Sequence, residues 1–531
     1  MSSKVLGLDF ETASLVDLKR VGVHVYAEHP STRVLCMAYA FDNEPVKVWR
    51  AGTPFPIEVF AHVTAGGRVR AWNAGFEWVI WNKVLARQLG PFPFNRGTGP
   101  FIDIHQLEDT MAAAAYWGLP MSLDQAGAAL RLPIQKDKAG HALMMRMCKP
   151  RSHSPLTGQT VWWHETDPEK FDSLVSYCGT DVEVERAVAR AIPPLPDDER
   201  QVWIADQRIN ARGVGVDMGF VESLRELALA AAADANRQLA VLTGGEVKSL
   251  NASAALLQWL QRHDYPHGDL KKDTVARRLD DDDCVGLERE VLELRADSAK
   301  TSAAKLGAML DACPDRRGVG RVRGMLQYYG ASRTGRWAGR LIQLQNMPRG
   351  SLGKGTEHAV TAIKRGAKLA DLEAVFGPAM GVVSSCLRAC IVAELGQKLV
   401  VADLAQIEAR VVAWLAGQQD VLDVFASGQD IYVHTANKIG SKDRQLGKVL
   451  VLACGFGMSA AKFLTTAEGY KVFLTPVQAD DAVRLWRSNN KQIVNFWYDC
   501  DRAARETIRT RQVVTVGPVK FGMFGNHMLI N

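Results

Sequence analysis

Cysteine patterns that would indicate disulfides or a zinc site are missing from this sequence. Its nine cysteines are an odd number, none forms a Cys-x-x-Cys pair, and none clusters with histidine at zinc-ligand spacing. These absences exclude a disulfide framework and a structural zinc site, and they predict reduced thiols, as in a cytosol. No uninterrupted apolar run is long enough to cross a bilayer. We therefore expect a cytoplasmic protein with no membrane partner.

A strong charge of one sign is also absent from the chain as a whole. The net charge is +6, from 64 basic and 58 acidic residues among 531. This balance does not by itself indicate a nucleic-acid partner. With 47% apolar and 23% charged residues, the composition excludes disordered and fibrous proteins. The length predicts roughly three or four domains, each large enough to bury its own core.

The first 192 residues alternate strand-like and helical patterns. Strand-like runs occur at Val5–Phe10, Arg33–Phe41 and Arg68–Trp72, and helical patterns cover Asp103–Gly118 and Lys170–Ala191. This alternation predicts an α/β domain over residues 1–192.

The rest of the chain begins after a proline-rich linker, Ile192–Asp198. Residues 199–312 are almost wholly helical, and residues 313–531 are mixed. Within the mixed part we expect a strand at Lys398–Ala402 and a helix at Lys442–Ala453. The pattern therefore predicts an α/β multidomain protein.

Carboxylates recur where the first domain changes from strand to helix. Asp9 and Glu11 are two residues apart on an expected strand, so both side chains lie on the same face. Two such carboxylates repel one another unless a cation lies between them, although an edge strand without function is the alternative. Glu77 follows a strand-like run and begins a helix. Tyr177 and Asp181 are four residues apart, on one face if that segment is helical.

This combination and its order resemble the DEDD superfamily of 3′–5′ exonucleases, in the subclass whose third motif carries tyrosine. The resemblance implies an RNase H-like domain that hydrolyses phosphodiesters with two Mg²⁺ ions, with Mn²⁺ as the alternative. It assigns Asp9, Glu11, Glu77 and Asp181 as metal ligands, and Tyr177 as the group that orients the attacking water. Glu77 departs from the aspartate usual at that position.

Positive charge is concentrated in one later stretch. No acidic residue occurs between Arg316 and Arg349, whereas arginine recurs throughout. Tyr328, Tyr329 and Trp337 are interleaved and add surfaces on which bases could stack. A solvated basic loop is the alternative. The pattern favours contact with a phosphate backbone, and its arginines are Arg316, Arg317, Arg321, Arg323, Arg333, Arg336, Arg340 and Arg349.

Asp403 follows directly on the expected strand at Lys398–Ala402 and precedes a helical pattern. From a strand end, a carboxylate can hold a metal ion against triphosphate oxygens. A buried aspartate that caps the following helix is the alternative.

A second helical pattern carries cations and apolar residues in register. Arg444, Lys448, Leu452 and Phe456 recur every four residues, so a helix would align them in one stripe. The two cations would bind phosphates, and the two apolar groups would face a base. Gly455 and Gly457 then predict the end of the helix.

These segments resemble the polymerase module of family A DNA polymerases, the bacterial DNA polymerase I type. The resemblance implies a right-hand module, with a helical thumb over residues 199–312 and a mixed palm with helical fingers over residues 313–531. An exonuclease followed by a polymerase is similar to the phage-type members, which would act in the host cytoplasm. The implied partners are primer-template DNA and dNTPs, with replication accessory proteins as further partners.

The same resemblance assigns roles to individual residues. Asp403 would bind both catalytic metal ions, and Glu408 would block a ribose 2′-hydroxyl. Arg444 and Lys448 would bind the incoming triphosphate. The other substrate-binding residues are Arg336, Gln345 and Asn346, which would contact the primer-template, and Gln406, Leu452 and Phe456, which lie in the nucleotide-binding segments. Phe456 takes the place of the family's template-site tyrosine, and Leu452 departs from the aromatic residue common there.

The second palm carboxylate of the family, in a His-Asp-Glu segment, has no counterpart in this sequence. His527 is followed by Met528 and Leu529. We therefore expect the C-terminal part of the palm to be missing and one metal ligand to be absent. The expected function is DNA-templated DNA synthesis with a proofreading exonuclease. The alternative is a 3′–5′ exonuclease with a polymerase-like platform that binds DNA and does not synthesise it.

Overall fold

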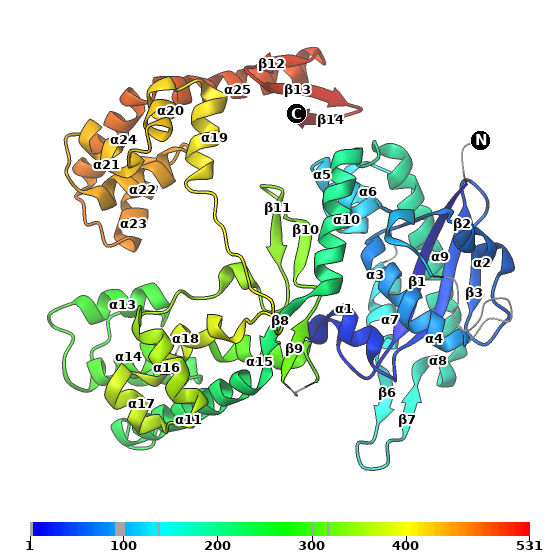
Figure 1. Cartoon of the computed structure of the whole chain (residues 1–531), viewed down its shortest axis with the longest axis horizontal. Helices are drawn as coiled ribbons and strands as arrows, with labels where there is room; N and C mark the ends of the chain where they lie inside the picture. The colour runs from blue at the N-terminus through cyan, green and yellow to red at the C-terminus, as the bar shows by residue number, and fades with distance from the viewer. Residues whose placement is uncertain (1–3, 91–100, 135–137, 299–301, 316–317, 531) are drawn as a thin grey trace. The chain divides into compact units, whose positions relative to one another are not determined.

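The computed structural model describes residues 4–90, 101–134, 138–298, 302–315 and 318–530. Tertiary contacts divide the chain into two compact units, Met1–Leu399 and Val400–Asn531. In Figure 1 the first unit runs from blue to yellow-green, and the second from yellow to red. The domain boundaries expected near residues 192 and 312 both fall inside the first unit and stay predictions.

A mixed five-stranded sheet organises the N-terminal part of the first unit (Figure 1), in the order β3-β2-β1-β4-β5. β1 pairs antiparallel with β2 and parallel with β4, and β4 pairs parallel with β5. The α/β organisation expected for this part of the chain is confirmed. The strands are β1 (Val5–Ala13), β2 (Arg33–Phe41), β3 (Lys47–Arg50), β4 (Arg68–Ala71) and β5 (Leu107–Asp109).

Alternation along β1 decides which side chains face which helices. Leu6, Leu8 and Phe10 lie in an apolar core on one face of the sheet. Asp9 and Glu11 point to the opposite face, where the long helix α9 (Pro168–Ala191) packs against β1 and β2. Asp167 caps this helix, and proline occupies its first position. The carboxylates of β1 therefore face α9.

The helix expected over Asp103–Gly118 is wrong in its first half. Leu107–Asp109 forms β5, because Leu107 pairs with Val69 of the neighbouring strand and sheet hydrogen bonds outweigh the local helical pattern. A helix begins only at Thr110, with Asp109 as its N-cap. The helices of this part are α1 (Leu18–Glu28), α2 (Ile57–Thr64), α3 (Ala74–Val79), η1 (Ile80–Leu85), α4 (Ala86–Leu89), η2 (Ile104–Gln106), α5 (Thr110–Tyr116) and α6 (Leu123–Ala129).

A helix and a hairpin precede α9. They are α7 (Lys138–Met147), β6 (Pro150–His153), β7 (Thr160–Trp162) and the short helix α8 (Trp163–Thr166). β6 and β7 pair antiparallel. Figure 1 shows this hairpin projecting from the rest of the first unit.

Helix α10 (Asp197–Arg212) follows the proline-rich linker and packs on the N-terminal part of the chain. Trp203 and Ile204 are buried in the same core as Leu6 and Phe10. The helical region expected after residue 199 is confirmed, apart from the short strand β8. Its elements are β8 (Val214–Asp217), α11 (Met218–Leu242), α12 (Ser253–Gln261), α13 (Lys272–Asp280), α14 (Gly286–Ser298) and α15 (Ser302–Ala312).

The remainder of the first unit contains short strands and helices. β8 pairs antiparallel with β9, and β10 and β11 form a hairpin. Helix α18 packs against α11 in a core of buried aliphatic side chains. The elements are β9 (Val319–Val322), β10 (Leu326–Ala331), β11 (Arg336–Gly339), η3 (Leu344–Asn346), α16 (Gly355–Lys364), α17 (Leu369–Phe376), α18 (Ala379–Cys386) and η4 (Leu387–Cys390).

The second unit is helical, with a small antiparallel sheet near its end. α22 packs tightly on α21, and α25 contacts both α19 and β12. Its elements are α19 (Ile407–Ala416), α20 (Gln419–Ala426), α21 (Ile431–Lys438), α22 (Arg444–Cys454), α23 (Ala460–Gly469), α24 (Pro476–Asn489), α25 (Lys491–Thr510), β12 (Val514–Val516), β13 (Val519–Phe524) and β14 (His527–Ile530).

The strand expected at Lys398–Ala402 is wrong. This segment has no secondary structure, and Val400 and Val401 are 83% and 91% exposed. A strand forms only where a neighbouring strand accepts its hydrogen bonds, and none of the described strands pairs with this segment. The helix expected at Lys442–Ala453 is confirmed as α22.

Within the described residues, no single helix is long and apolar enough to cross a membrane. One pair passes the same test together, Leu369–Phe376 with Ala379–Cys390, but it bends by 85° at its break.

Candidate functional site

Asp9 and Glu11 lie side by side on the face of β1 that is covered by α9. Their register partners on β2 are Ala38 and Cys36. One carboxylate oxygen of each lies within 4.8 Å of the other and of the Cys178 sulfur. The prediction that both side chains lie on one face of the strand is therefore confirmed, and α9 covers that face.

Cys178 is a member of this cluster that the sequence analysis missed. Its Sγ donates to the backbone oxygen and to Oδ2 of Asp9, both at 3.5 Å. Burial raises the pKa of the Cys178 thiol well above its ordinary value. The thiol is therefore protonated and acts as a hydrogen-bond donor to Asp9 rather than as a metal ligand. Its spacing of three residues from Asp181 on a helix was the available signal.

Tyr177 and Asp181 lie on α9, as expected, and both are buried. Burial, followed by the charges of Asp181 and Glu11, raises the pKa of the Tyr177 phenol. The effect of these charges shows that the Tyr177 phenol lies close to the carboxylates of α9 and β1. A neutral phenol in that position can donate a hydrogen bond to a water molecule or a phosphate oxygen.

Glu77 joins the cluster from the first turn of α3 and is 3% exposed. Burial, followed by the charge of Asp9, raises the pKa of the Glu77 carboxyl well above its usual range. Among the described residues, nothing forms a hydrogen bond to the buried Glu77 Oε2. The structure therefore brings together all five residues expected in the first set.

The donor chemistry of this cluster fits a divalent cation. Carboxylate oxygens are the ligands that Mg²⁺ prefers, and a cation between Asp9 and Glu77 would remove the repulsion that raises the Glu77 pKa. The buried Glu77 Oε2 accepts no hydrogen bond from the described residues, so its lone pairs could coordinate such an ion. Asp9 and Glu11 have the spacing to hold such an ion, and Glu77, which feels the charge of Asp9, and Asp181, beside Tyr177, are the further carboxylates of the cluster.

Asp109 supports Glu77 and was also missed. Its carboxylate accepts the backbone N–H of Ala112 at 2.8 Å and those of Asn73 and Ala74, where α3 begins. Burial raises the pKa of Asp109 to about 7 against the lowering effect of these hydrogen bonds. Asp109 thus fixes the start of the helix that presents Glu77. The only sequence signal was its place as a helix cap before Thr110.

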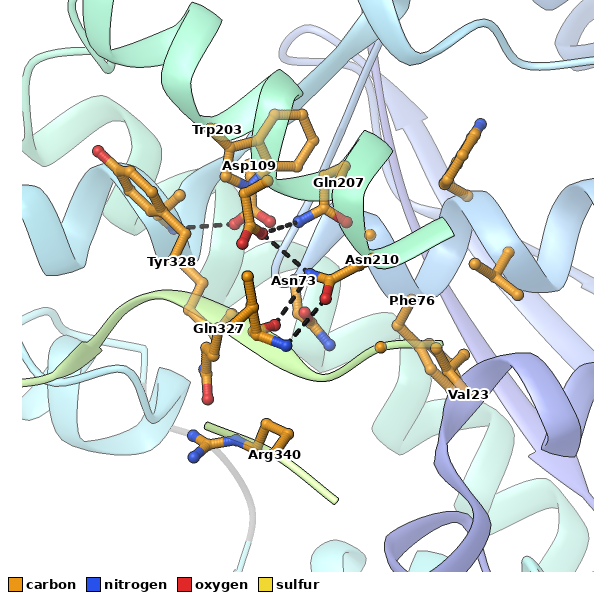
Figure 2. A pocket seen from close by; sticks show the side chains of 18 of the residues that line it. Val23, Asn73, Phe76, Asp109, Trp203, Gln207, Asn210, Gln327, Tyr328 and Arg340 are labelled. Carbon is orange, nitrogen blue, oxygen red and sulfur yellow. Dashed lines mark hydrogen bonds between the residues drawn. The ribbon is translucent and has the colours of Figure 1, made fainter. Parts of the chain in front are cut away.

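A pocket of about 280 Å³ lies beside this helix start (Figure 2), between α3, α10 and β10. Figure 2 shows Gln207 and Asn210 of α10 pointing into it near Asn73 and Phe76. A Cβ at Gly75 would meet the Gln207 amide oxygen at 2.3 Å, so only glycine permits this approach. Asn210 in turn holds Leu326 through paired hydrogen bonds of 2.8 and 2.9 Å.

The arginine-rich stretch forms β9, β10 and β11. Arg316 and Arg317 lie outside the described residues. Arg333, Arg336 and Arg340 are exposed on or beside the β10–β11 hairpin. Gln345 lies against this hairpin, since a Cβ at Gly339 would meet its amide at 2.8 Å. Gln345 and Asn346 are exposed, so the structure groups the expected DNA-contacting residues on one hairpin and the turn after it.

The stacking role expected for Tyr328 is wrong. The side chain is 5% exposed within the first core, and its hydroxyl donates to Glu199 at 2.6 Å. Trp337 remains 42% exposed, although its indole N–H is bound to Asp206 at 2.8 Å. The pattern could not separate these cases, because burial of Tyr328 depends on α10.

In the second unit, α22 carries Arg444 and Lys448 as expected. Arg444 Nε donates to Asp430 at 2.8 Å, and its guanidinium lies over Tyr432 at 5.1 Å. Lys448 lies over Tyr470 at 5.7 Å. A Cβ at Gly447 would meet the Tyr432 carbonyl oxygen at 2.0 Å, so this glycine lets α22 pack directly on α21.

The stripe of four ends earlier than expected. α22 stops at Cys454, so Leu452 lies on the helix and Phe456 lies in the turn after it. Phe456 instead lines an apolar pocket of about 300 Å³ with Glu408 and Val411 of α19. The helix ends where Gly455 and Gly457 predict it, and Gly457 has a left-handed φ of 72°, so only the place of Phe456 in the stripe is wrong.

Asp403 lies in the exposed segment before α19, and Gln406 caps that helix with a left-handed φ of 47°. Glu408 occupies the first turn of α19. Within the described residues, no ion pair joins Asp403 to Arg444 or Lys448. The structure thus brings Glu408 and Phe456 together in one pocket.

A family model described as DNA polymerase family A matches residues 272–516. A DNA polymerase from Bacillus phage SP02 is 36% identical over 537 residues, covering 96% of this chain and 78% of that protein. DNA polymerase I of Chloroflexus aurantiacus is 33% identical over 82 residues, covering 14% of this chain and 9% of that protein.

A solved structure shares the fold. It is the POL domain of Pol1 from M. smegmatis in complex with DNA primer-template and dNTP, which aligns with a TM-score of 0.56 at 14% identity. The alignment covers 95% of this chain and 76% of that chain.

Proposed function

The chain belongs to DNA polymerase family A, and from this premise we propose that it extends a DNA primer on a DNA template, with dNTPs as substrates. The observation that carries the proposal is identity of 36% to a phage DNA polymerase along 96% of the chain. A solved family neighbour with primer-template DNA and dNTP supports these partners. Phage or prophage DNA replication is the proposed process.

We assign the synthesis roles to the second unit and to the β10–β11 hairpin. Arg444 and Lys448 are aligned on α22 and bind the triphosphate, where their charge offsets the charge that develops in phosphoryl transfer. Glu408 excludes a ribose 2′-hydroxyl, and Phe456 lies next to it in the same apolar pocket. Arg336, Gln345 and Asn346 contact the primer-template. Gln406 and Leu452 border the nucleotide, and Asp403 binds the metal ions of synthesis.

We propose a second activity, 3′–5′ exonuclease, for an RNase H-like domain over residues 1–192. Its support is the buried carboxylate cluster, in which Glu77 Oε2 has no hydrogen-bond partner among the described residues. Asp9, Glu11, Glu77 and Asp181 would hold Mg²⁺, or Mn²⁺ in its place. When bound, such ions supply a deprotonated water and stabilise the leaving oxygen.

The protein's own residues prepare this site. Tyr177 keeps its phenolic proton and donates it in a hydrogen bond that orients the attacking water. The Cys178 thiol donates to Asp9 and fixes the rotamer of that carboxylate. Asp109 holds the beginning of α3, which presents Glu77. Tyr177, Cys178, Glu77 and Asp109 are buried and Asp9 is half-buried, so little bulk water reaches these groups.

One paired assay tests both activities. The purified chain is given a 5′-labelled primer-template with Mg²⁺, with and without dNTPs. Extension that disappears in Asp403→Ala and persists in Asp9→Ala supports synthesis by the second unit. Shortening with the opposite dependence supports the exonuclease. Shortening without any extension would contradict the first proposal and leave a nuclease with a DNA-binding platform.

A further inference from the structure

A cationic segment lies next to the carboxylate cluster. We define the arm as residues 140–164, which include most of α7, the β6–β7 hairpin and the first two residues of α8. The arm carries Arg146, Lys149 and Arg151, and it contains no aspartate or glutamate. Its histidines are His141, His153 and His164. A surface segment with charge of one sign attracts polyanions.

Two arginines of the arm make cation–π contacts with the same aromatic ring. The guanidinium of Arg151 lies 5.1 Å from the centroid of the Trp163 ring, and that of Arg146 lies 5.8 Å from it. Both side chains are exposed, and in the described part of the chain neither forms an ion pair. A cation–π contact orients a guanidinium without neutralising it. Their N–H donors therefore remain available to phosphate oxygens.

The base of the arm is fixed to the carboxylate cluster. Ser14, just after β1, donates its backbone N–H to the Cys148 carbonyl at 3.0 Å. Met147 and Trp162 share a buried core with Tyr177. The residues beside these arginines thus pack in the same core as Tyr177 of the proposed nuclease site. The arm and the site therefore have a defined relative position.

A positive surface near this site would offset the negative charge that repels DNA. Four carboxylates converge there, and they repel a DNA strand before any metal ion is shared between them and a phosphate. Lys149 is partly offset by Asp17 at 3.3 Å, and the charge of Arg151 is partly offset by Asp167, although neither arginine forms an ion pair among the described residues. Arg146 and Arg151 therefore supply most of the attraction. Such a charge gradient raises the local concentration of a polyanion.

The tip of the hairpin favours an unpaired strand. Leu156 lies in the turn between β6 and β7 and is 99% exposed. A fully exposed aliphatic side chain at the end of a hairpin whose base carries Arg151 can pack on the face of an unpaired base, whereas a duplex hides these faces in its stack.

From these contacts we propose that the arm binds the phosphate backbone of single-stranded DNA and leads its 3′ end to the carboxylate cluster. The delivery of the 3′ end rests on the proposed exonuclease activity. The binding of single-stranded DNA does not, because the charges and the exposed tip exist without a metal ion.

Binding is measured with the full chain in EDTA, so that no cleavage occurs. A fluorescent twelve-nucleotide oligo(dT) is titrated by anisotropy at several salt concentrations. The test variant is R146A/R151A, and the control K4A/K47A removes the same charge from exposed lysines that precede β1 and begin β3. Loss of two phosphate contacts should reduce the slope of log K against log salt by about 1.4. Thermal unfolding of each variant verifies that it is folded.

The possible outcomes test three points: binding by the arm, preference for a single strand, and the exonuclease activity. A smaller slope in R146A/R151A alone supports the arm, and equal slopes in all three proteins would overturn it. An equal loss on a blunt duplex of the same length would overturn the preference for a single strand. If wild-type protein in Mg²⁺ shortens no primer while the slopes still differ, the exonuclease proposal fails and the DNA-binding arm stands.

Discussion

The indole N–H of Trp337 donates to Oδ1 of Asp206 at 2.8 Å and links the β10–β11 hairpin to α10 across 131 residues of sequence. Asp206 is 1% exposed, and Gln207 and Asn210 donate to its other oxygen. Burial raises the pKa of Asp206 to about 6, although these hydrogen bonds lower it. The carboxylate therefore joins the hairpin to α10, whose Trp203 and Ile204 pack in the core of the N-terminal sheet.

Replacing Trp337 by phenylalanine should destabilise this link in a pH-dependent way. The folded pKa of about 6 exceeds the ordinary value of 3.8, so stability from Asp206 is complete below pH 4 and is lost as pH rises through 6. Without the indole N–H of Trp337, the ionised Asp206 carboxylate has one hydrogen-bond donor fewer to offset the cost of its burial. Trp337→Phe should therefore cost about 1–2 kcal/mol at pH 8 and less at pH 4. Urea unfolding at both pH values measures this, and an equal cost would contradict the role of the charged carboxylate.

Glu77→Gln should stabilise the metal-free protein and abolish shortening of a primer. The amide keeps the shape of the carboxylate but removes a buried charge that lies near Asp9. Because the folded pKa of Glu77 is raised, the charged form is most costly at high pH, so the gain in stability is larger at pH 8 than at pH 4. Thermal unfolding in EDTA measures the gain, and Glu226→Gln, on the exposed surface of α11, is the control. A midpoint that falls would argue against electrostatic strain at Glu77.

Asp109 is expected to act as a positioning residue for Glu77. Asp109→Ala leaves the backbone N–H groups of Asn73 and Ala74 without this acceptor, so α3 is less well fixed. Shortening of a primer should slow by about 10- to 100-fold and require more Mg²⁺, while extension is unchanged. Asp109→Asn retains one acceptor and should lose less. If the Mg²⁺ dependence stays that of the wild type, Asp109 supports only the local fold.

A buried ion pair in the helical region offers a test that is independent of DNA. Arg278 binds both oxygens of Glu288 at 2.7 and 2.8 Å, and each side chain is 6% exposed. Arg278→Met leaves the Glu288 carboxylate buried without its partner and should cost about 3–5 kcal/mol. The double variant R278M/E288L should recover most of this loss. Calorimetric unfolding separates the two, and equal losses would show that packing rather than charge pairing is responsible.

Lys448→Ala should weaken use of the incoming nucleotide. Loss of one charged contact to the triphosphate should lower kcat/KM for dNTP by about 10- to 100-fold. Lys491→Ala, at the exposed start of α25, removes the same charge and should leave primer extension unchanged. Steady-state extension of a labelled primer measures both variants. Equal kinetics for the two would place the triphosphate elsewhere.

Some of the candidate site could be predicted from local patterns alone. The spacing of two between Asp9 and Glu11 and of four between Tyr177 and Asp181 places each pair on one face of its element, whatever surrounds it. The same holds for Arg444 and Lys448 on α22. Resemblance to family A followed from later segments in their order, those that carry Arg336, Asp403 and Arg444, and the comparisons show that family.

Other features depended on partners distant in the sequence. Leu107–Asp109 became a strand because β4 lies beside it, whereas the more apolar Lys398–Ala402 has no described strand to pair with. Tyr328 is buried because α10 packs over it, and no pattern within β10 contains that information.

Periodicity thus determined which functional side chains share a face, because the repeat of a strand or helix is a local property of the backbone. Tertiary structure decided which faces meet. It brought Cys178 to Asp9, Asp109 to the start of α3, and Trp337 to Asp206, since each of these hydrogen bonds joins segments that only packing places together.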